Sequence, residues 1–166
     1  MIICGIDPGL NGGVSFLDSN MKLHAEKAPT FQFTVGKKKK TVLDMWTLIA
    51  MIDDYKIDHV YIESQQAMPK QGVSSTFKTG FGYGLYIGIL VCKRLSYTEV
   101  SSRTWKPMVN CPADKDASRM RASQLFPNYS NLWTLKNQDG IAESAMIAYY
   151  GLIQQQSSQE YVSSQH

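Results

Sequence analysis

Four acidic residues occupy positions where carboxylates could act together. Asp7 ends the apolar run "IICGI", and Glu63 ends the apolar run "VYI". Each acid is therefore predicted at the carboxyl end of a buried strand, and the two are adjacent if those strands are neighbours in a sheet. Asp139 and Glu143 follow in "NQDGIAESA". Their spacing of four residues places both on one face of a helix.

Each acid alone also has an ordinary structural explanation. Asp7 precedes Pro-Gly, as turn residues often do, and Asp139 would complement the dipole of a helix in its first turn. Carboxylates that converge, however, repel one another and need a cation. Oxygen ligands of this kind suit Mg²⁺ or Mn²⁺. Two such ions about 3.5–4 Å apart form the site that hydrolyses phosphodiesters, in which one ion activates water and the other stabilises the leaving oxygen.

The elements that would position these acids can be read from the apolar periodicity. Strands are predicted over 1–6, 14–19, 22–31, 58–64 and 96–101, and helices over 42–55, 76–95, 102–109, 115–126 and 138–155. Thr41 and Asp44 fit a capping box before the first helix, and 34–40 is predicted as an exposed loop. The order, with the short helices taken together, is βββαβαβαα. It predicts an α/β domain with a mixed sheet and helices on both faces.

Length and composition favour a single domain. The 166 residues are 43% hydrophobic and 19% charged, which is ordinary for a globular protein. We expect one domain over 1–153 and a flexible polar tail over 154–166. No apolar run approaches the roughly 18 residues of a membrane span. Three widely spaced cysteines and an apolar start without a basic lead favour a cytoplasmic protein, in the host cytoplasm if a phage encodes it.

Positive charge is concentrated in a few segments although the net charge is only +3. Lysines fill 37–40, residues 65–98 contain four basic residues and no acid, and 101–127 is also basic. This asymmetry is compatible with a polyanion such as nucleic acid, although many domains carry a basic face without such a partner. Trp46, Trp105 and Trp133 are interpreted as packing residues.

Several separated motifs together resemble one known family. The stretches "GIDPG", "YIES", the basic region 103–121 and "DGIAESA" resemble RuvC-type Holliday-junction resolvases of the ribonuclease H-like superfamily. The stretches "AMPKQGVSSTF", "GYGLYIGIL" and "SRTWKPMV" are most similar to phage-encoded and monokaryotic-chloroplast-type plant members. The resemblance covers roughly 1–153, and "IDPG" alone would be weak support for it.

The resemblance implies a specific site and activity. It implies a ribonuclease H-like mixed five-stranded sheet and a homodimer that makes paired symmetric nicks at four-way DNA junctions. It also implies two Mg²⁺ ions per active site, which Mn²⁺ can replace. The metal-binding carboxylates would be Asp7, Glu63, Asp139 and Glu143. A lysine in each of two matching stretches implies catalytic support from Lys106 and Lys115.

This chain departs from bacterial members at two points. Those members place two aspartates three residues apart late in the chain, whereas here the spacing is four and the second acid is Glu143. They also carry an aromatic wedge three residues after the second acid, where this chain has Gln66. Met68 and Phe77 are the alternative candidates for opening the junction.

The residues expected to contact DNA come from the loop after Glu63, the second basic region and the lysine run. Arg119 and Arg121 are interpreted either as phosphate contacts or as part of a solvated helix face. The full set is Gln65, Gln66, Met68, Lys70, Gln71, Ser74, Ser75, Phe77, Lys78, Arg103, Lys106, Lys115, Arg119, Arg121, Lys38 and Lys39.

The leading hypothesis is therefore a Mg²⁺-dependent crossover-junction endodeoxyribonuclease with branched DNA as its partner. Two alternatives stay open. One is a ribonuclease H-like nuclease that acts on flaps or RNA·DNA hybrids. The other is a junction-binding module without cleavage activity, against which the presence of all four acids argues.

Overall fold

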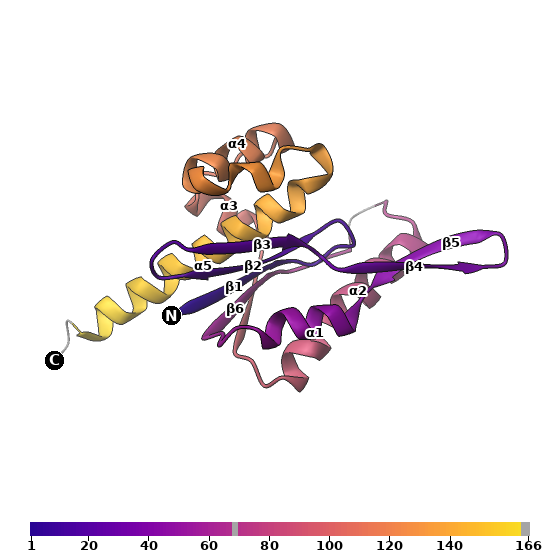
Figure 1. Cartoon of the computed structure of the whole chain (residues 1–166), viewed down its shortest axis with the longest axis horizontal. Coiled ribbons are helices and arrows are strands. Elements are labelled where there is room, and N and C mark those ends of the chain that lie inside the picture. Colours follow the sequence, from indigo (N-terminus) through magenta and orange to yellow (C-terminus); the bar gives the residue numbers. More distant parts are fainter. Residues whose placement is uncertain (68–69, 164–166) are drawn as a thin grey trace.

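A mixed five-stranded sheet forms the centre of the molecule in the computed structural model, which describes residues 1–67 and 70–163 (Figure 1). The strand order is β3-β2-β1-β6-β7. The first three strands are antiparallel, whereas β6 and β7 run parallel to β1. Their bounds are β1 Ile2–Asp7, β2 Gly13–Asp18, β3 Leu23–Lys27, β6 His59–Glu63 and β7 Tyr97–Val100. The predicted α/β fold with a mixed five-stranded sheet is confirmed.

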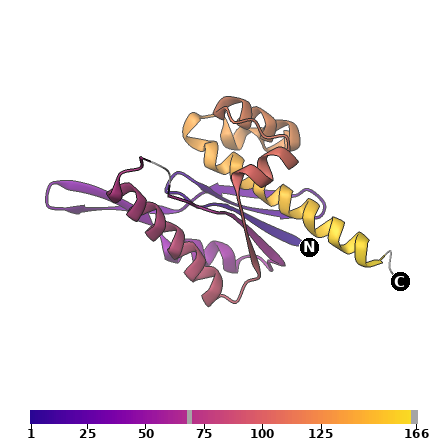
Figure 2. The same ribbon diagram turned by 180° about the vertical axis from the view of Figure 1, so that it is seen from behind.

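Helices cover both faces of this sheet (Figures 1 and 2). Alternate residues of β1 belong to different cores: Ile3 packs with α5, and Cys4 packs with α1 and α2. This alternation follows from the two-residue period of a strand. The helices are α1 Met45–Asp53, α2 Val73–Cys92, α3 Ser102–Met108, α4 Lys115–Leu125 and α5 Asp139–Ser163, with short 3-10 helices η1 Pro127–Trp133 and η2 Lys136–Gln138.

Helix α5 lies directly on the backbone of β1. A methyl group at Gly5 would overlap the carbonyl oxygen of Ser144 and the backbone nitrogen of Ala148. Only glycine permits this approach, because any Cβ would push the helix off the sheet. The contact fixes the position of α5, and so of the two acids near its start, relative to the strand that carries Asp7.

The segment predicted as an exposed loop is instead a β-hairpin. Strand β4 (Thr30–Val35) pairs with β5 (Lys38–Leu43). Gly36, with a φ of +61°, begins the two-residue turn between them, as the hairpin turn with glycine first requires. The lysine run concealed the alternation of β-prone residues in 30–35. The predicted third strand is correspondingly split, because β3 ends at Lys27.

Two details of the first helix also differ from prediction. Asp44, and not Thr41, is its N-cap, and its carboxylate accepts from the backbone N–H and the hydroxyl of Thr47. Trp46 is 82% exposed and is not a core residue. It lies in the first turn, outside the stripe of buried Leu48 and Ile52. Trp105 and Trp133 are buried, as predicted.

The last helix continues over most of the segment predicted as a flexible tail. The helix ends at Ser163. It can continue this far because the helix propensities of Gln and Ser permit a helix even where there is no apolar stripe. In the described residues, every helix is too short or too polar to cross a membrane.

Replacing Gly5 tests the close contact between helix and sheet. We expect Gly5→Ala to destabilise the protein by about 1–3 kcal/mol, because the added methyl group meets fixed backbone atoms. Gly82→Ala in α2 is the matched control, since its Cβ would meet no atom within 4 Å. That change should stabilise the protein by roughly 0.5–1 kcal/mol through helix propensity. Urea unfolding measures both, and equal effects would contradict the packing argument.

Candidate active site

Two acids lie side by side at one edge of the sheet. Strands β1 and β6 are parallel neighbours with Ile6 opposite Ile62, and the next residue on each strand is an acid, Asp7 or Glu63. The carboxyl ends of parallel strands meet at one edge, which is where α/β folds place function. The predicted adjacency of these two carboxylates is confirmed.

The start of α5 brings two further acids to the same edge. Gly140 packs its backbone against the turn after β1, where a Cβ would overlap the carbonyl oxygen of Asn11 and the Cα of Gly12. Asp139 and Glu143 lie on either side of this contact in the first two turns of the helix. Gly13, where a Cβ would overlap the carbonyl oxygen of Gly140, and Gly140 therefore both permit the close approach of these two segments.

Glu143 is the most enclosed acid of the site, with 5% of its surface exposed. Lys106 from α3 and Lys115 from the start of α4 both donate to its Oε1, each at 2.9 Å. Burial alone would raise the pKa of Glu143, but the hydrogen bonds from Lys115 and Lys106 outweigh it, so this pKa lies below its ordinary value. Both lysines predicted to support catalysis thus lie at the acid site.

Asp7 and Glu63 show the opposite shift. Burial, followed by the charges of Glu143 and Glu63, raises the pKa of Asp7 to about 7, against the opposing effect of Lys115 and Lys106. Burial also raises the pKa of Glu63, and the hydrogen bond from Trp105 only partly offsets it. The negative charge is therefore disfavoured on Asp7 and Glu63, whereas Glu143 beside them is ionised. The site lacks enough positive charge to balance all three carboxylates in their ionised form.

Trp105 has a role beyond packing. Its buried indole Nε1–H donates to Oε2 of Glu63 at 2.9 Å, and Nζ of Lys106 lies 5.2 Å from the centroid of its ring. The residue therefore orients one acid and holds one lysine. The sequence signal for this role is the position of Trp105 beside Lys106 in "SRTWKP".

Tyr86 is a core residue whose hydroxyl group lacks a partner. Its hydroxyl is buried in the core cluster of Ile6 and Ile62 and has no hydrogen-bond partner among the described residues. Burial, and after it the charge of Asp7, raises its pKa. A buried unpaired hydroxyl costs about 1–3 kcal/mol. A hydrated cation beside Asp7 would offer such a group a partner.

Asp139 is held separately from the other three acids. Arg119 of α4 donates to it from one guanidinium nitrogen and to Asp116 from the other. The charges that act most strongly on Asp7 are those of Glu143, Glu63, Lys115 and Lys106. Asp139 is thus at the same edge but is neutralised by its own cation.

The four carboxylates are chemically suited to bind a divalent metal ion. Lysine and arginine side chains neutralise the two carboxylates of α5. Within residues 1–67 and 70–163, no three acidic, histidine or cysteine side chains stand in metal-binding geometry. The carboxylates are nevertheless of the type that Mg²⁺ and Mn²⁺ prefer, and the mutual repulsion at Asp7 and Glu63 favours a cation. An ion would have to compete with Lys106, Lys115 and Arg119 for the acids of α5.

The structure brings some of the predicted DNA contacts together and separates others. Lys106, Lys115 and Arg119 surround the acids. Arg121 instead donates to the carbonyl oxygen of Val109 at the end of α3, and Arg103 is exposed on α3. Gln65, Gln66, Lys70 and Gln71 lie between β6 and α2, and Ser74, Ser75, Phe77 and Lys78 lie in the first turns of α2. Met68 lies outside the described residues.

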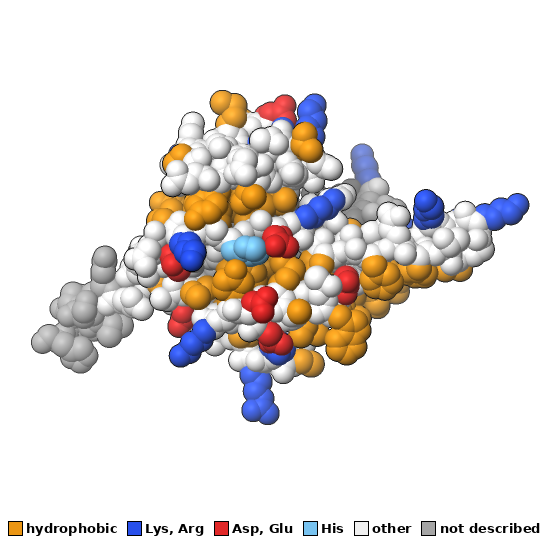
Figure 3. All heavy atoms as spheres, viewed as in Figure 1, with side chains coloured by type: hydrophobic (Ala, Val, Ile, Leu, Met, Phe, Trp, Pro, Cys, Tyr) orange, Lys and Arg blue, Asp and Glu red, His pale blue; other side chains and the backbone are white. Residues whose placement is uncertain are grey.

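The hairpin carries basic residues away from the sheet. It projects from the same end as the acids (Figure 1). Lys38 and Lys39 are exposed near its tip. Figure 3 shows Lys and Arg side chains along one edge and at the tip, and hydrophobic side chains along the other edge. The two edges therefore offer different surfaces.

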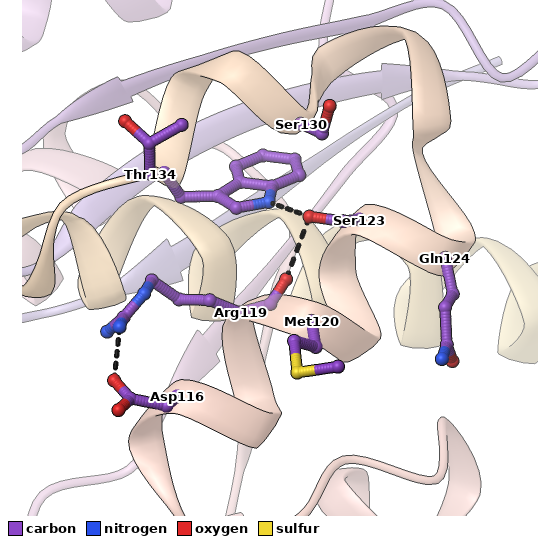
Figure 4. Close-up of a pocket in the computed structure, with 8 residues that line it drawn as sticks. Asp116, Arg119, Met120, Ser123, Gln124, Ser130 and Thr134 are labelled. Carbon is purple, nitrogen blue, oxygen red and sulfur yellow. Dashed lines mark hydrogen bonds and ion pairs between the residues drawn. The ribbon is translucent and has the colours of Figure 1, made fainter.

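A hollow on the outer side of α4 is distinct from the acid site. It is lined by residues of α4 and η1, among them Arg119, Ser123, Trp133 and Thr134 (Figure 4). Its lining contains none of the four predicted metal ligands. Arg119 connects the two places, because its guanidinium group pairs with Asp139.

Comparison with known proteins places the fold. No family model and no curated protein matches the sequence. Two solved structures from Thermus thermophilus align well, RuvC in complex with a Holliday junction substrate and RuvC without it. Each has a TM-score of 0.57 and 12% sequence identity, and each alignment covers 90% of this chain. The alignments cover 92% of the RuvC chain in the complex and 94% of the RuvC chain without the substrate. The fowlpox virus Holliday junction resolvase aligns with a TM-score of 0.49 and 19% identity over 95% of this chain and 99% of its own. At these identities the RuvC matches show a shared fold.

The shifted pKa of Asp7 predicts how stability depends on pH. The folded state keeps a proton on Asp7 up to about pH 7, whereas the unfolded chain releases it near pH 3.8. This group therefore makes the fold less stable as the pH rises through that range. Asp7→Asn removes the titration, and we expect it to stabilise the metal-free protein at pH 8 by on the order of 2 kcal/mol.

Thermal unfolding in chelator at pH 4.5, 6 and 8 measures the effect. The gain should shrink toward pH 4.5, where wild-type Asp7 is protonated. Asp54→Asn is the matched control, because that carboxylate is exposed at the end of α1. If Asp7→Asn and wild type differ in stability by the same amount at all three pH values, the raised pKa of Asp7 is contradicted.

Proposed function

We propose that the chain is a Mg²⁺-dependent endonuclease that resolves four-way DNA junctions. The observation that carries the proposal is the convergence of Asp7, Glu63 and Glu143 at one sheet edge with Lys106 and Lys115 beside them. Carboxylates that cannot all be ionised without a cation, next to ammonium groups, suit a reaction at a phosphodiester. Mn²⁺ is expected to replace Mg²⁺.

Asp7, Glu63, Glu143 and Asp139 would hold two ions, which would supply an activated water and stabilise the leaving oxygen. The chain's own groups do the rest. Trp105 fixes the orientation of Glu63 through its indole N–H. Lys106 and Lys115 offset the negative charge that develops on the attacked phosphate, because their ammonium groups already lie in the site.

Branched DNA is the substrate that the motifs and the fold favour together. One of the RuvC structures that share the fold holds a Holliday junction substrate, and the motifs around the acids resemble those of the same family. The exposed polar and basic residues after Glu63 and on α2 adjoin the site. Flaps and RNA·DNA hybrids remain the alternative substrates, and binding without cleavage remains the alternative function.

A homodimer would supply the second active site that paired symmetric nicks require. Helix α2 offers an unpartnered surface for it. Phe77 is 72% and Phe81 59% exposed, and their rings stack at 6.3 Å. Gly80 and Gly84 leave open space beside them, which is where a second helix could approach closely.

Cleavage of a labelled four-way junction tests the function. With Mg²⁺ or Mn²⁺ we expect paired nicks that chelator abolishes. Asp7→Asn should lower the rate by roughly 100-fold or more while the variant still binds the junction. Linear duplex, a flap and an RNA·DNA hybrid serve as competing substrates. Preferential cutting of the hybrid or flap would contradict the proposed substrate, and undiminished cleavage by Asp7→Asn would contradict the proposed site.

Light scattering tests the dimer. The wild-type protein should have twice the mass of the chain, and Phe81→Glu should weaken the dimer by about tenfold or more by placing a charge in an apolar contact. Met120→Glu is the matched control, since Met120 is also exposed but lies on α4. A monomeric wild-type mass with undiminished paired nicks would refute the proposal.

A further inference from the structure

Arg119 bridges two acids, of which one is exposed and the other is partly enclosed. One guanidinium nitrogen pairs with Asp116, three residues earlier on α4, and another pairs with Asp139 at the start of α5. The side chain of Arg119 is 12% exposed and that of Asp139 is 23% exposed, whereas that of Asp116 is 63% exposed. The enclosed half of this bridge is therefore the half that holds a predicted metal ligand.

The backbone at Arg119 is anchored by a buried residue. Ser123 donates its hydroxyl to the carbonyl oxygen of Arg119 at 3.0 Å, and the indole N–H of buried Trp133 donates to Ser123 at 2.9 Å. Figure 4 shows this chain of hydrogen bonds and the guanidinium group extending toward Asp116. The helix is thus held in place, so that a change of partner at Arg119 would involve the side chain alone.

A guanidinium group and a divalent cation compete for the same carboxylate. Arginine stays charged at any ordinary pH, so deprotonation does not release Asp139, whereas a competing anion can. A phosphodiester is such an anion, because it accepts two parallel hydrogen bonds from the planar group. Lys106 and Lys115 place two further cations beside the acids, and these would attract that phosphate.

We propose that Arg119 keeps Asp139 from the metal site in the free protein and releases it when a DNA phosphate binds the guanidinium group. The inference rests on the proposed nuclease function and adds regulation to it. The full set of four acids would then be available only on substrate. By thermodynamic linkage, DNA must raise the affinity for the divalent cation by the same factor as the cation raises the affinity for DNA.

Calcium titration tests the coupling without relying on cleavage, because Ca²⁺ takes the same oxygen ligands. Calorimetry would compare wild type and Arg119→Gln, each alone and bound to a four-way junction, with the heat of Ca²⁺ binding to the junction subtracted. For wild type we expect the junction to tighten Ca²⁺ binding by roughly 5–150-fold. For Arg119→Gln, binding should already be tight without DNA, and the enhancement should disappear.

Two further variants separate this mechanism from a general effect of charge. Arg121→Gln also removes a positive charge from α4, but its guanidinium group contacts Val109 and Gln124 and, in the part of the chain that the structure describes, no acid. It should leave Ca²⁺ affinity without DNA unchanged. In an Asp139→Asn background, Arg119→Gln should no longer alter Ca²⁺ affinity, since the carboxylate at issue is gone. Circular dichroism and unfolding confirm that each variant is folded.

The possible outcomes test this inference separately from the proposed nuclease function on which it rests. If Arg119→Gln tightens Ca²⁺ binding equally with and without the junction, the effect is general electrostatics and the inference is overturned. Unchanged Ca²⁺ affinity in Arg119→Gln, with wild type still binding, overturns it as well. If the wild-type protein binds no divalent cation in either condition, the proposed metal-dependent function fails together with the inference.

Discussion

Repulsion among carboxylates that the fold forces to one edge of the sheet is the constraint on which the rest of the site depends. Asp7 and Glu63 are placed there by parallel strand pairing, and Glu143 by the packing of α5. Each additional negative charge makes the next more costly at short distance in a partly buried setting. The protein responds in two ways: protonation is favoured at Asp7, and lysine partners are supplied at Glu143.

The helices beyond β7 exist in part to supply these partners. Helix α3 contributes Trp105 and Lys106, which contact Glu63 and Glu143, and α4 contributes Lys115 and Arg119, which contact Glu143 and Asp139. A buried charge without a partner would destabilise the fold by several kcal/mol. The same contacts therefore support the fold without metal and hold cationic groups where, under the proposed function, a phosphate would be attacked.

Two surfaces have no obvious purpose within one copy of the chain. The β4–β5 hairpin places aromatic residues and lysines away from the sheet, and α2 exposes Phe77 and Phe81 beside glycines where an added Cβ would meet no atom within 4 Å. Exposed apolar groups of this size usually mark an interaction surface. Under the proposed function, the apolar surface would bind the second copy of the chain and the basic surface would bind DNA.

Local pattern alone determined much of this protein. Asp7 and Glu63 could be placed at strand ends because strand periodicity is readable within six residues, and the spacing of Asp139 and Glu143 placed them on one helix. Local pattern also misled, since the lysine run hid β4 and β5, and Trp46 resembled a core residue. Only the tertiary structure decided that Trp105 orients Glu63, that the Tyr86 hydroxyl has no partner among the described residues, and that Arg119 pairs with Asp139. The two residues of each pair lie at least 20 positions apart in the chain, and no periodicity records which side chains long-range packing will bring together.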